Sequence, residues 1–475
     1  MNPAAAPLEL HPDRALPAEP GVRAIAREIL TETEPLPIVS MHGHVEVSVF
    51  VADAPFPDPA TLFIRPDHYL TRMLGSQGIG RRELLGDPER PLDARATWRL
   101  FCENWRLFRG TPTRYWLEDV LAGVLGVTEQ PAATSADRLF DQVSARLAEP
   151  GFRPVALLDR FGIEIISTTD AAWDDLAGHQ ELARRLGGSR VPPTFRPDAL
   201  LAVAAPDWRQ RLARLEAAAE REVGDYDSFL SALEDRREHF IAAGARATDH
   251  AAVSADTTPL GRADASRLFA RALAGEATAA EQQAFWAHMI FEFARMSCRD
   301  GLTMQFHPGS LRDYLPSVHD TWGPDVGYDL PVAMDYTRGL RPLLEAFGHQ
   351  PGFRFIVFTL DEDTFSRELA PLAGVFPAMR LGAPWWFLDT RDGMRRYREA
   401  VTDAAGFYNT TGFVDDTRAF CSIPARHNLA RRVDAGFLAG LVAEHRLPLD
   451  EAVETAVDLA YHLPKAAYPP IARQG

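Results

Sequence analysis

The sequence predicts an α/β protein, a (β/α)8 barrel with a helical insertion after its first strand. Short apolar runs end in polar or charged residues, as the strands of a parallel sheet do where they present side chains to a site. Amphipathic helical stretches separate most of these runs. The stretch between the first two runs is too long for a simple crossover, which indicates the insertion.

The apolar runs contain many β-branched residues, and their number favours a closed barrel over an open sheet. The predicted strands are Leu36–His42, Ile163–Asp170, Leu302–His307, Phe353–Asp361, Leu381–Trp386 and Phe407–Asp416. The predicted helices are Pro206–Phe240, Ser266–Arg299, Val332–Phe347 and Leu429–Ala443.

The chain divides into four predicted segments. Residues 1–35 form an N-terminal tail and lead-in, and residues 36–54 contain the first barrel strand and the loop after it. Residues 55–150, rich in Trp, Phe, Leu and Arg, form a mostly helical insertion. Residues 151–475 complete the barrel and include its C-terminal helices.

Composition and charge restrict the partners. The chain has 46% hydrophobic and 24% charged residues, as globular proteins do. Its net charge of -16 repels nucleic acid and anionic membranes, so neither is an expected partner. A small anionic substrate would need a local arginine cluster, which Arg196, Arg312 and Arg418 could form, although each alone could be a surface ion-pairing residue. The chain length is compatible with a homo-oligomer.

Cysteine usage indicates a reducing compartment. Cys102, Cys298 and Cys421 are far apart and form no Cys-x-x-Cys pair. The N-terminus shows no basic-then-apolar signal pattern, and no apolar run approaches the roughly 18 residues of a membrane span. We expect a cytoplasmic protein.

The basic residues are almost entirely arginine: of 50 lysine and arginine residues, only Lys465 is a lysine. A Walker phosphate loop, a Schiff-base enzyme and a carbamate-bridged dinuclear metal site each need a lysine. Lys465 lies near the C-terminus, away from any predicted strand end. These three chemistries are therefore not expected.

Two histidines follow the first predicted strand. His42 and His44 are two positions apart, so at a strand end both imidazoles point to one face and can bind one divalent ion. Gly43 between them permits close backbone approach. Taken alone, such a pair can also be a coincidence in a loop, and its place at a strand end favours the metal site.

Asp416 ends the last predicted strand. The first and last strands of a closed barrel are neighbours, so its carboxylate can reach an ion held by His42 and His44. Two histidines and one carboxylate make a mononuclear site with open positions. The alternative role for Asp416 is a helix cap.

Two other strand ends carry candidates. His307 precedes Pro308 and Gly309, where it could serve as a proton shuttle or auxiliary ligand, or else as a core residue. Trp385 and Trp386 are adjacent, so in a strand one would point inward and one outward; core packing is the default reading and a substrate wall the alternative.

Taken in order, the motifs resemble those of the uronate (glucuronate) isomerase family of the amidohydrolase superfamily. The matching segments are Met41–Val45, Asp67–Leu74, Ser167–His179, Phe195–Asp198, Gly244–His250, Phe306–Asp313, Gly323–Asp329, Trp385–Met394, Asp415–Phe420 and Pro424–Arg432. The departures, such as Arg114–Glu118 and Asp313–Leu315, lie in polar segments around the sugar hydroxyls and mark a divergent member.

The resemblance implies a distorted (β/α)8 barrel with a helical insertion after the first strand. It implies His42, His44 and Asp416 as ligands of one Zn²⁺-like divalent ion, without a carbamylated lysine. It further implies a substrate pocket lined by Tyr69, Arg196, His307, Arg312, Trp386 and Arg418.

The first hypothesis for function is an aldose-ketose isomerase acting on a hexuronate or related polyhydroxy acid, of the D-glucuronate to D-fructuronate type. The substrate carboxylate would pair with Arg196 or Arg312. Its hydroxyl and carbonyl oxygens would face the metal, Arg418 and His307, while a proton moves from C2 to C1 through a cis-enediol.

The base in this reaction is expected to be Tyr69 or Asp416. A phenol would need its pKa lowered by nearby arginines to serve. Two alternatives stay open: an amidohydrolase-type hydrolase or lyase that uses the same mononuclear site on another small carboxylic acid, and a non-catalytic barrel used for binding.

Overall fold

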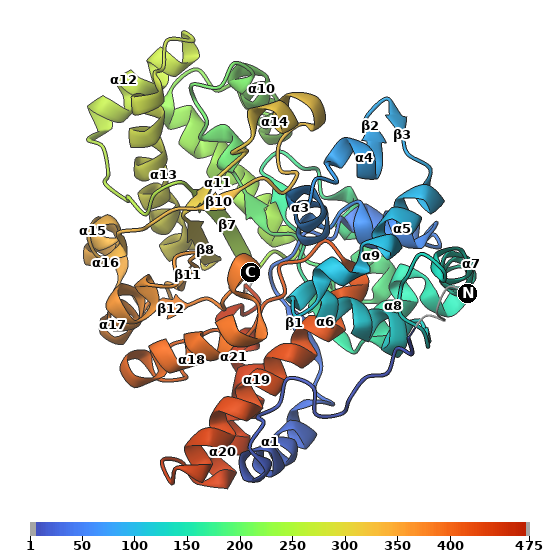
Figure 1. Ribbon diagram of the computed structural model, residues 1–475. Helices are drawn as coiled ribbons and strands as arrows, with labels where there is room; N and C mark the ends of the chain where they lie inside the picture. Colours follow the sequence, from blue (N-terminus) through green and yellow to red (C-terminus); the bar gives the residue numbers. More distant parts are fainter. Residues whose placement is uncertain (1–5, 472–475) are drawn as a thin grey trace.

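The computed structural model describes residues 6–471 and contains a six-stranded parallel sheet (Figure 1). Its strand order is β12-β11-β8-β7-β6-β5, and β1 pairs with β4 in a separate parallel pair. The strands are β1 (Ile38–Ser40), β4 (Ile163–Ile166), β5 (Asp170–Ala171), β6 (Phe195–Arg196), β7 (Ala247–Ala252), β8 (Thr303–Pro308), β11 (Phe355–Val357) and β12 (Met379–Leu381). The predicted α/β architecture with a parallel sheet is confirmed.

The register places the carboxyl ends of these strands at one edge. Residues Ala247–Ala252 of β7 pair with Thr303–Pro308 of β8, and β11 pairs with both β8 and β12. Because every one of these pairs is parallel, side chains at the carboxyl ends of the strands gather at the same edge of the sheet.

Hydrogen bonds connect the two parallel sheets and the chain after β12. The backbone N–H of Thr168 donates to the carbonyl of Pro192, and that of Asp170 to Thr194, which joins the β4 segment to the chain before β6. Beyond β12, Thr410 forms a parallel bridge with Leu381. The N–H of His44 donates to the carbonyl of Thr417 at 3.0 Å, so the chain after β1 lies beside the chain near the C-terminal end.

Four of the six predicted strands contain β1, β4, β8 and β11, and the other two predictions were wrong. Within Leu381–Trp386 only Leu381 is in a strand, because Pro384 lacks a donor and Trp386 begins a short 3-10 helix, Trp386–Leu388. The run Phe407–Asp416 holds only the bridge at Thr410. Strands β6 and β7 were not predicted.

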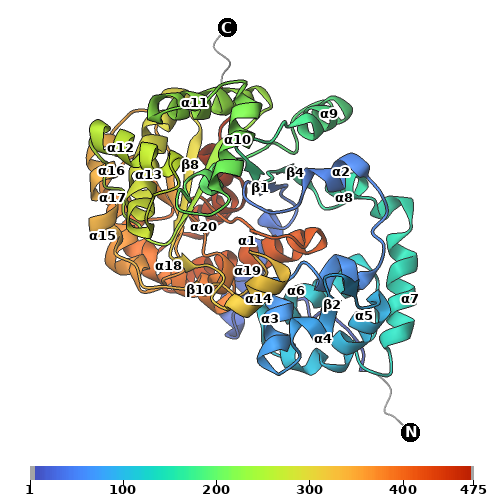
Figure 2. The same ribbon diagram turned by 90° about the horizontal axis from the view of Figure 1, so that it is seen from above.

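Helices cover the outer side of the sheet (Figures 1 and 2). They are α10 (Trp208–Ala219), α11 (Tyr226–Ala242), α12 (Arg262–Leu273), α13 (Ala279–Asp300), α15 (Tyr336–Gly339), α16 (Arg341–Phe347), α17 (Ala370–Val375) and α18 (Arg391–Ala405). Helix α9 (Ala177–Leu186) lies apart from this sheet (Figure 2) and packs against α2 (Val47–Ala52). The single helix predicted at Ser266–Arg299 is two helices, because Gly275 adopts a left-handed φ of 74° and Thr278 starts α13 with a capping box.

The chain between β1 and β4 is rich in helix and gathers to one side of the molecule (Figure 1). It contains α2 (Val47–Ala52), α3 (His68–Ser76), α4 (Arg81–Leu85), α5 (Ala94–Glu103), α6 (Pro112–Glu118), α7 (Ala136–Leu147), α8 (Pro154–Arg160) and the antiparallel pair β2 (Gly86–Asp87) and β3 (Arg90–Pro91). The division of the chain at residues 36, 55 and 151 stays a prediction.

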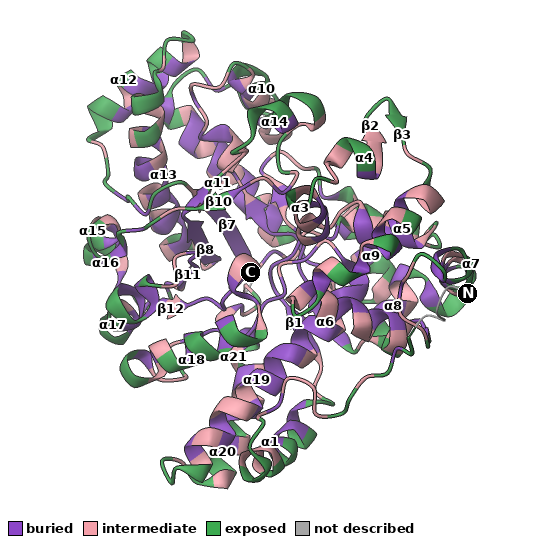
Figure 3. Ribbon diagram, viewed as in Figure 1, coloured by how far each residue is buried: buried purple, intermediate pink, exposed green. Residues whose placement is uncertain are grey.

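Two further groups of elements complete the fold. The antiparallel pair β9 (Ser310–Leu311) and β10 (Leu330–Pro331) encloses α14 (Pro316–Trp322), and we call residues 310–331 the strap. At the bottom of Figure 1, α1 (Pro20–Thr33) packs against the long, mostly buried α19 (Ile423–Ala443) and α20 (Leu449–Val457), which α21 (Leu463–Ala467) follows (Figure 3). Within residues 6–471, no helix combines the length and apolarity needed to cross a membrane.

Candidate active site

One cavity of about 280 Å³ opens where the strands end. It is bounded by the last residues of β6 and β8, by residues that follow β1 and β12, by α3, and by the strap. All nine residues predicted for the site line it: His42, His44, Tyr69, Arg196, His307, Arg312, Trp386, Asp416 and Arg418. The structure therefore brings together side chains that are separated by up to several hundred residues in the sequence.

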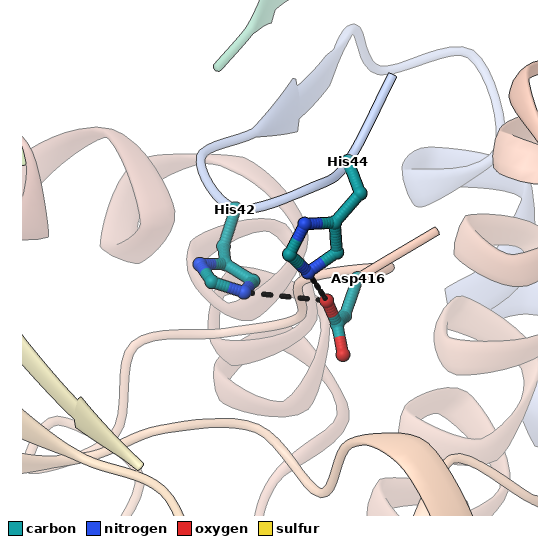
Figure 4. A group of neighbouring side chains, drawn as sticks. All are labelled: His42, His44 and Asp416. Carbon is teal, nitrogen blue, oxygen red and sulfur yellow. Dashed lines mark ion pairs between the residues drawn. The ribbon is translucent and has the colours of Figure 1, made fainter. Parts of the chain in front are cut away.

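The predicted metal ligands converge on one carboxylate oxygen (Figure 4). The Nε2 atoms of His42 and His44 lie 3.2 and 3.1 Å from Oδ1 of Asp416. Asp416 reaches this position with a left-handed φ of 43°, a backbone conformation that costs energy in a non-glycine residue and is concentrated at functional sites. A Cβ at Gly43 would make only ordinary contacts, the nearest at 3.6 Å from the carbonyl oxygen of Thr417, so the backbone approach there does not depend on glycine.

The donor set fits a divalent cation. Oδ1 of Asp416 is buried without a well-directed hydrogen bond, although two imidazole nitrogens lie beside it. Burial acts to raise the pKa of Asp416, but the two imidazoles outweigh it and hold that pKa well below its usual range. Two imidazole nitrogens and an ionised carboxylate oxygen are ligands that first-row divalent metals accept.

A buried carboxylate that the sequence analysis missed, Asp249 of β7, lies behind these ligands. Its Oδ1 is 2.7 Å from Nε2 of His307 and 3.5 Å from Nδ1 of His42, and its Oδ2 is 3.3 Å from Nη1 of Arg196. Burial opposes its ionisation, but His307, His42 and Arg196 together hold the pKa of Asp249 well below its ordinary value. Asp249 is therefore a fixed negative charge that orients three cavity side chains.

The cavity arginines differ in their carboxylate partners. Nε of Arg196 lies 2.9 Å from Asp198, and Nη1 of Arg312 donates to the buried Asp329 at 2.7 Å. Arg418 pairs with Asp325 of the strap, which is half exposed. This arrangement supplies the cationic lining that an anionic ligand requires in a chain of net charge -16.

Tyr69 and Trp386 complete the lining. Tyr69 lies in the first turn of α3, where its backbone N–H donates to the side chain of the N-cap residue Asp67. Its hydroxyl donates to Oδ1 of Asp389 at 2.7 Å. Burial first, and Asp389 second, raise the pKa of Tyr69 well above its ordinary value and outweigh Arg426, which favours the phenolate, so the predicted lowering of this pKa was wrong. The guanidinium of Arg312 lies 5.4 Å from the ring centre of Trp386.

Three further lining residues were missed. Arg426 of α19 contacts Asp389 at 2.9 Å, and burial together with Arg418 lowers the pKa of His68 to about 4. Asp325 has a left-handed φ of 61°. None of these stands at a predicted strand end, and the signal available for all three was their place inside three of the matching segments.

Comparison with known proteins covers nearly the whole chain. The sequence profile of the family described as glucuronate isomerase matches residues 23–468. A uronate isomerase of Rhizobium meliloti is 50% identical over 464 residues, which are 97% of this chain and 99% of the relative.

Two solved structures show the same arrangement of the chain. The crystal structure of glucuronate isomerase from Caulobacter crescentus has a TM-score of 0.95 and 45% identity, and covers 97% of both chains. That of uronate isomerase from Thermotoga maritima has a TM-score of 0.91 and 27% identity, with 97% of this chain and 100% of that one covered. With its fold, its cavity and its sequence in agreement over this length, the chain belongs to the glucuronate isomerase family.

Proposed function

We propose that this protein is a metal-dependent isomerase that converts an open-chain hexuronate from aldose to ketose, as in D-glucuronate to D-fructuronate. The observation that carries the proposal is a single cavity in which His42, His44 and Asp416 meet an arginine-rich lining, in a chain about half identical to a uronate isomerase. The relatives reported above favour this activity over the hydrolase or lyase alternative and over a non-catalytic barrel.

The scaffold is inferred to be a distorted, closed (β/α)8 barrel. The hydrogen bonds from β4 to the chain before β6, and from His44 to Thr417, support closure across the gaps between the assigned strands. The helices between β1 and β4 are inferred to be the insertion, which contributes Tyr69 of α3 to the cavity.

His42, His44 and Asp416 would hold the metal ion, which we propose to be Zn²⁺ from the nitrogen and oxygen donor set. When bound, such an ion supplies Lewis-acid polarisation of substrate oxygens. Oδ1 of Asp416 faces the imidazoles, and its other oxygen points away from them (Figure 4).

Different cavity side chains would bind different groups of the substrate. Arg196 or Arg312 would pair with the carboxylate, and Trp386 would form a wall of the pocket. Arg418 and His307 would bind hydroxyl and carbonyl oxygens, of which one gains negative charge as the enediol forms. The free oxygen of Asp416 is our candidate for the base that moves the C2 proton to C1, because the imidazoles of His42 and His44 face the other oxygen and leave this one open (Figure 4).

The test is direct. Purified protein is supplied with Zn²⁺ and with D-glucuronate or D-galacturonate, and ketose formation is followed. The proposal expects ketose from at least one sugar, loss of turnover with a chelator, and solvent deuterium at C1 or C2 of recovered sugar. Absence of ketose from both sugars with metal bound would refute it, and turnover without exchange would refute the enediol route in favour of a hydride shift.

A small anionic substrate is thus the proposed partner, and a homo-oligomer stays a prediction. We also propose a cytoplasmic location, which is supported by cysteines Cys102, Cys298 and Cys421 being free in the structure.

A further inference from the structure

A buried carboxylate outside the cavity lining holds one of the lining side chains. Asp389 follows the short helix Trp386–Leu388 and precedes α18, and its side chain is 3% exposed. Its Oδ1 accepts the Tyr69 hydroxyl at 2.7 Å, and its Oδ2 accepts Nη1 of Arg426 at 2.9 Å. Both carboxylate oxygens therefore have a partner, and each partner itself lines the cavity.

Arg426, the second partner of Asp389, is held by contacts of its own. Nε of Arg426 donates to Oγ of Ser422 at 3.1 Å, and the guanidinium lies 3.6 Å from the ring centre of Trp116. The Tyr69 ring meets the same Trp116 edge-on, with ring centres 5.5 Å apart. Packing therefore fixes Tyr69 of α3 and Arg426 of α19 around Asp389, which lies in the turn between the short helix Trp386–Leu388 and α18.

Together, Tyr69 and Asp389 can pass on a proton without the formation of a free phenolate. Burial and Asp389 raise the pKa of Tyr69 so far that a free phenolate does not form near neutral pH. Burial also raises the pKa of Asp389, to about 7, against the opposing effect of Arg426, so this carboxylate can accept and release a proton. A proton that reaches the Tyr69 oxygen can therefore be matched by one that leaves it for Asp389.

We propose that Asp389 is a positioning residue that acts through Tyr69, accepting the phenolic proton when Tyr69 takes a proton from one substrate oxygen and returning it when Tyr69 protonates the neighbouring oxygen. The inference rests on the proposed isomerisation, in which O2 loses a proton and O1 gains one while the C2 proton moves to C1. In the first half, the O2–H bond and the Tyr69 O–H bond break while a new Tyr69 O–H bond and an Asp389 O–H bond form. The second half reverses these changes at O1, so no proton is lost and no oxidant is needed.

The test is a double-mutant cycle between Asp389→Asn and Tyr69→Phe. An amide keeps the size and a hydrogen-bonding oxygen but does not take up a proton, so D389N should lower kcat by about 10- to 100-fold with KM changed less than about threefold. Y69F should lose a similar factor, and the double variant no more than Y69F alone. Wild-type kcat in D389N, or losses that multiply in the double variant, would overturn the proposal.

A matched control separates this role from general stability. Asp434 accepts hydrogen bonds from Arg398 at 2.6 and 3.0 Å in a partly buried pair that joins α18 to α19 outside the main cavity. D434N should lower the unfolding temperature but leave kcat unchanged.

If D389N does not fold, D389E takes its place. This variant should lower kcat with Tyr69 present and have no effect on the residual rate of Y69F. An equal loss in both backgrounds would overturn the proposal. If the wild-type protein forms ketose and D389N is equally active, the proposed function stands and only this inference is overturned.

Discussion

His44 is the candidate ligand whose replacement should disturb the fold least, because its side chain is 24% exposed, against 5% for His42. His44→Asn removes one of three convergent ligand atoms and should weaken metal binding by at least about 10-fold. Metal content after dialysis, measured by mass spectrometry, checks this. His288→Asn removes a buried histidine that contacts only Tyr226 and Leu260 among the described hydrogen bonds, and should keep the metal. Equal metal content in both variants would contradict the site.

Asp249 supplies a second prediction at the scale of single residues. Asp249→Asn replaces one acceptor oxygen of a carboxylate shared by His42, His307 and Arg196, so at least one of these side chains loses its partner. We expect metal affinity to fall by about 10- to 100-fold, as measured by competition with a chromophoric chelator. Asp170→Asn alters another buried aspartate, outside the cavity, and should leave the affinity unchanged. A wild-type affinity in D249N would show that the carboxylate does not orient the ligands.

The two predictions also show where sequence reasoning succeeds for single residues. His42 and His44 were found because strand geometry alone places i and i+2 on one face, and Asp416 because the ends of a barrel meet. Asp249 was missed because its partners are distant in sequence, and no local spacing relates it to His307. The pKa of Tyr69 was misjudged for a similar reason: the nearest charge is the carboxylate of Asp389, and burial dominates.

At the scale of elements, the strap is placed by a close contact with α3. Gly327 of the strap has a φ of 94°, and a Cβ there would lie 2.9 Å from Cβ of His68. Gly323→Ala provides a matched control, because its φ of 82° imposes similar strain but an added Cβ meets no atom within 4 Å. We expect G327A to lower kcat/KM by about 10-fold through displacement of cavity residues, and G323A to change it less than about twofold.

Steady-state kinetics and thermal unfolding of both glycine variants distinguish this from a loss of stability. Both should unfold at a lower temperature, because each places an L-residue in a left-handed conformation. Matching kinetic losses in G327A and G323A would mean that strain, and not the contact with His68, is responsible.

The strands themselves were predictable where a short run carries several buried apolar residues. The runs containing β1, β4, β8 and β11 were found for this reason. Strand β7 (Ala247–Ala252) was missed because Thr248, Asp249 and His250 are buried polar residues, so the strand does not form an apolar run. Asp249 contacts the site, whereas His250 and Thr248 bond to each other. The chain after β12 was overpredicted because its apolar residues pack in short helix and loop.

At the scale of the whole molecule, the first and last parts of the chain are built against each other. His44 donates to Thr417, and α1 packs on α19. Arg431 of α19 donates to the carbonyls of Glu34, Leu36 and Pro37 at 2.9 to 3.0 Å, just before β1. The strand that delivers His42 and His44 is therefore anchored by a helix near the other end of the chain.

The contact of Arg431 with the residues before β1 predicts different effects for two destabilising variants. Arg431→Met leaves the three carbonyls without their donor and should cost about 1–3 kcal/mol, with looser placement of β1. Ile29→Ala empties a fully buried position between α1 and α19 and should cost about 2–5 kcal/mol without touching the lead-in to β1. Well below their unfolding temperatures, only R431M should show weaker metal binding, by about 3- to 10-fold on the scale of lost supporting contacts. Chelator competition and thermal unfolding on the two proteins measure both quantities, and a metal affinity that follows stability alone, lower in I29A than in R431M, would refute the anchoring of the ligand strand by α19.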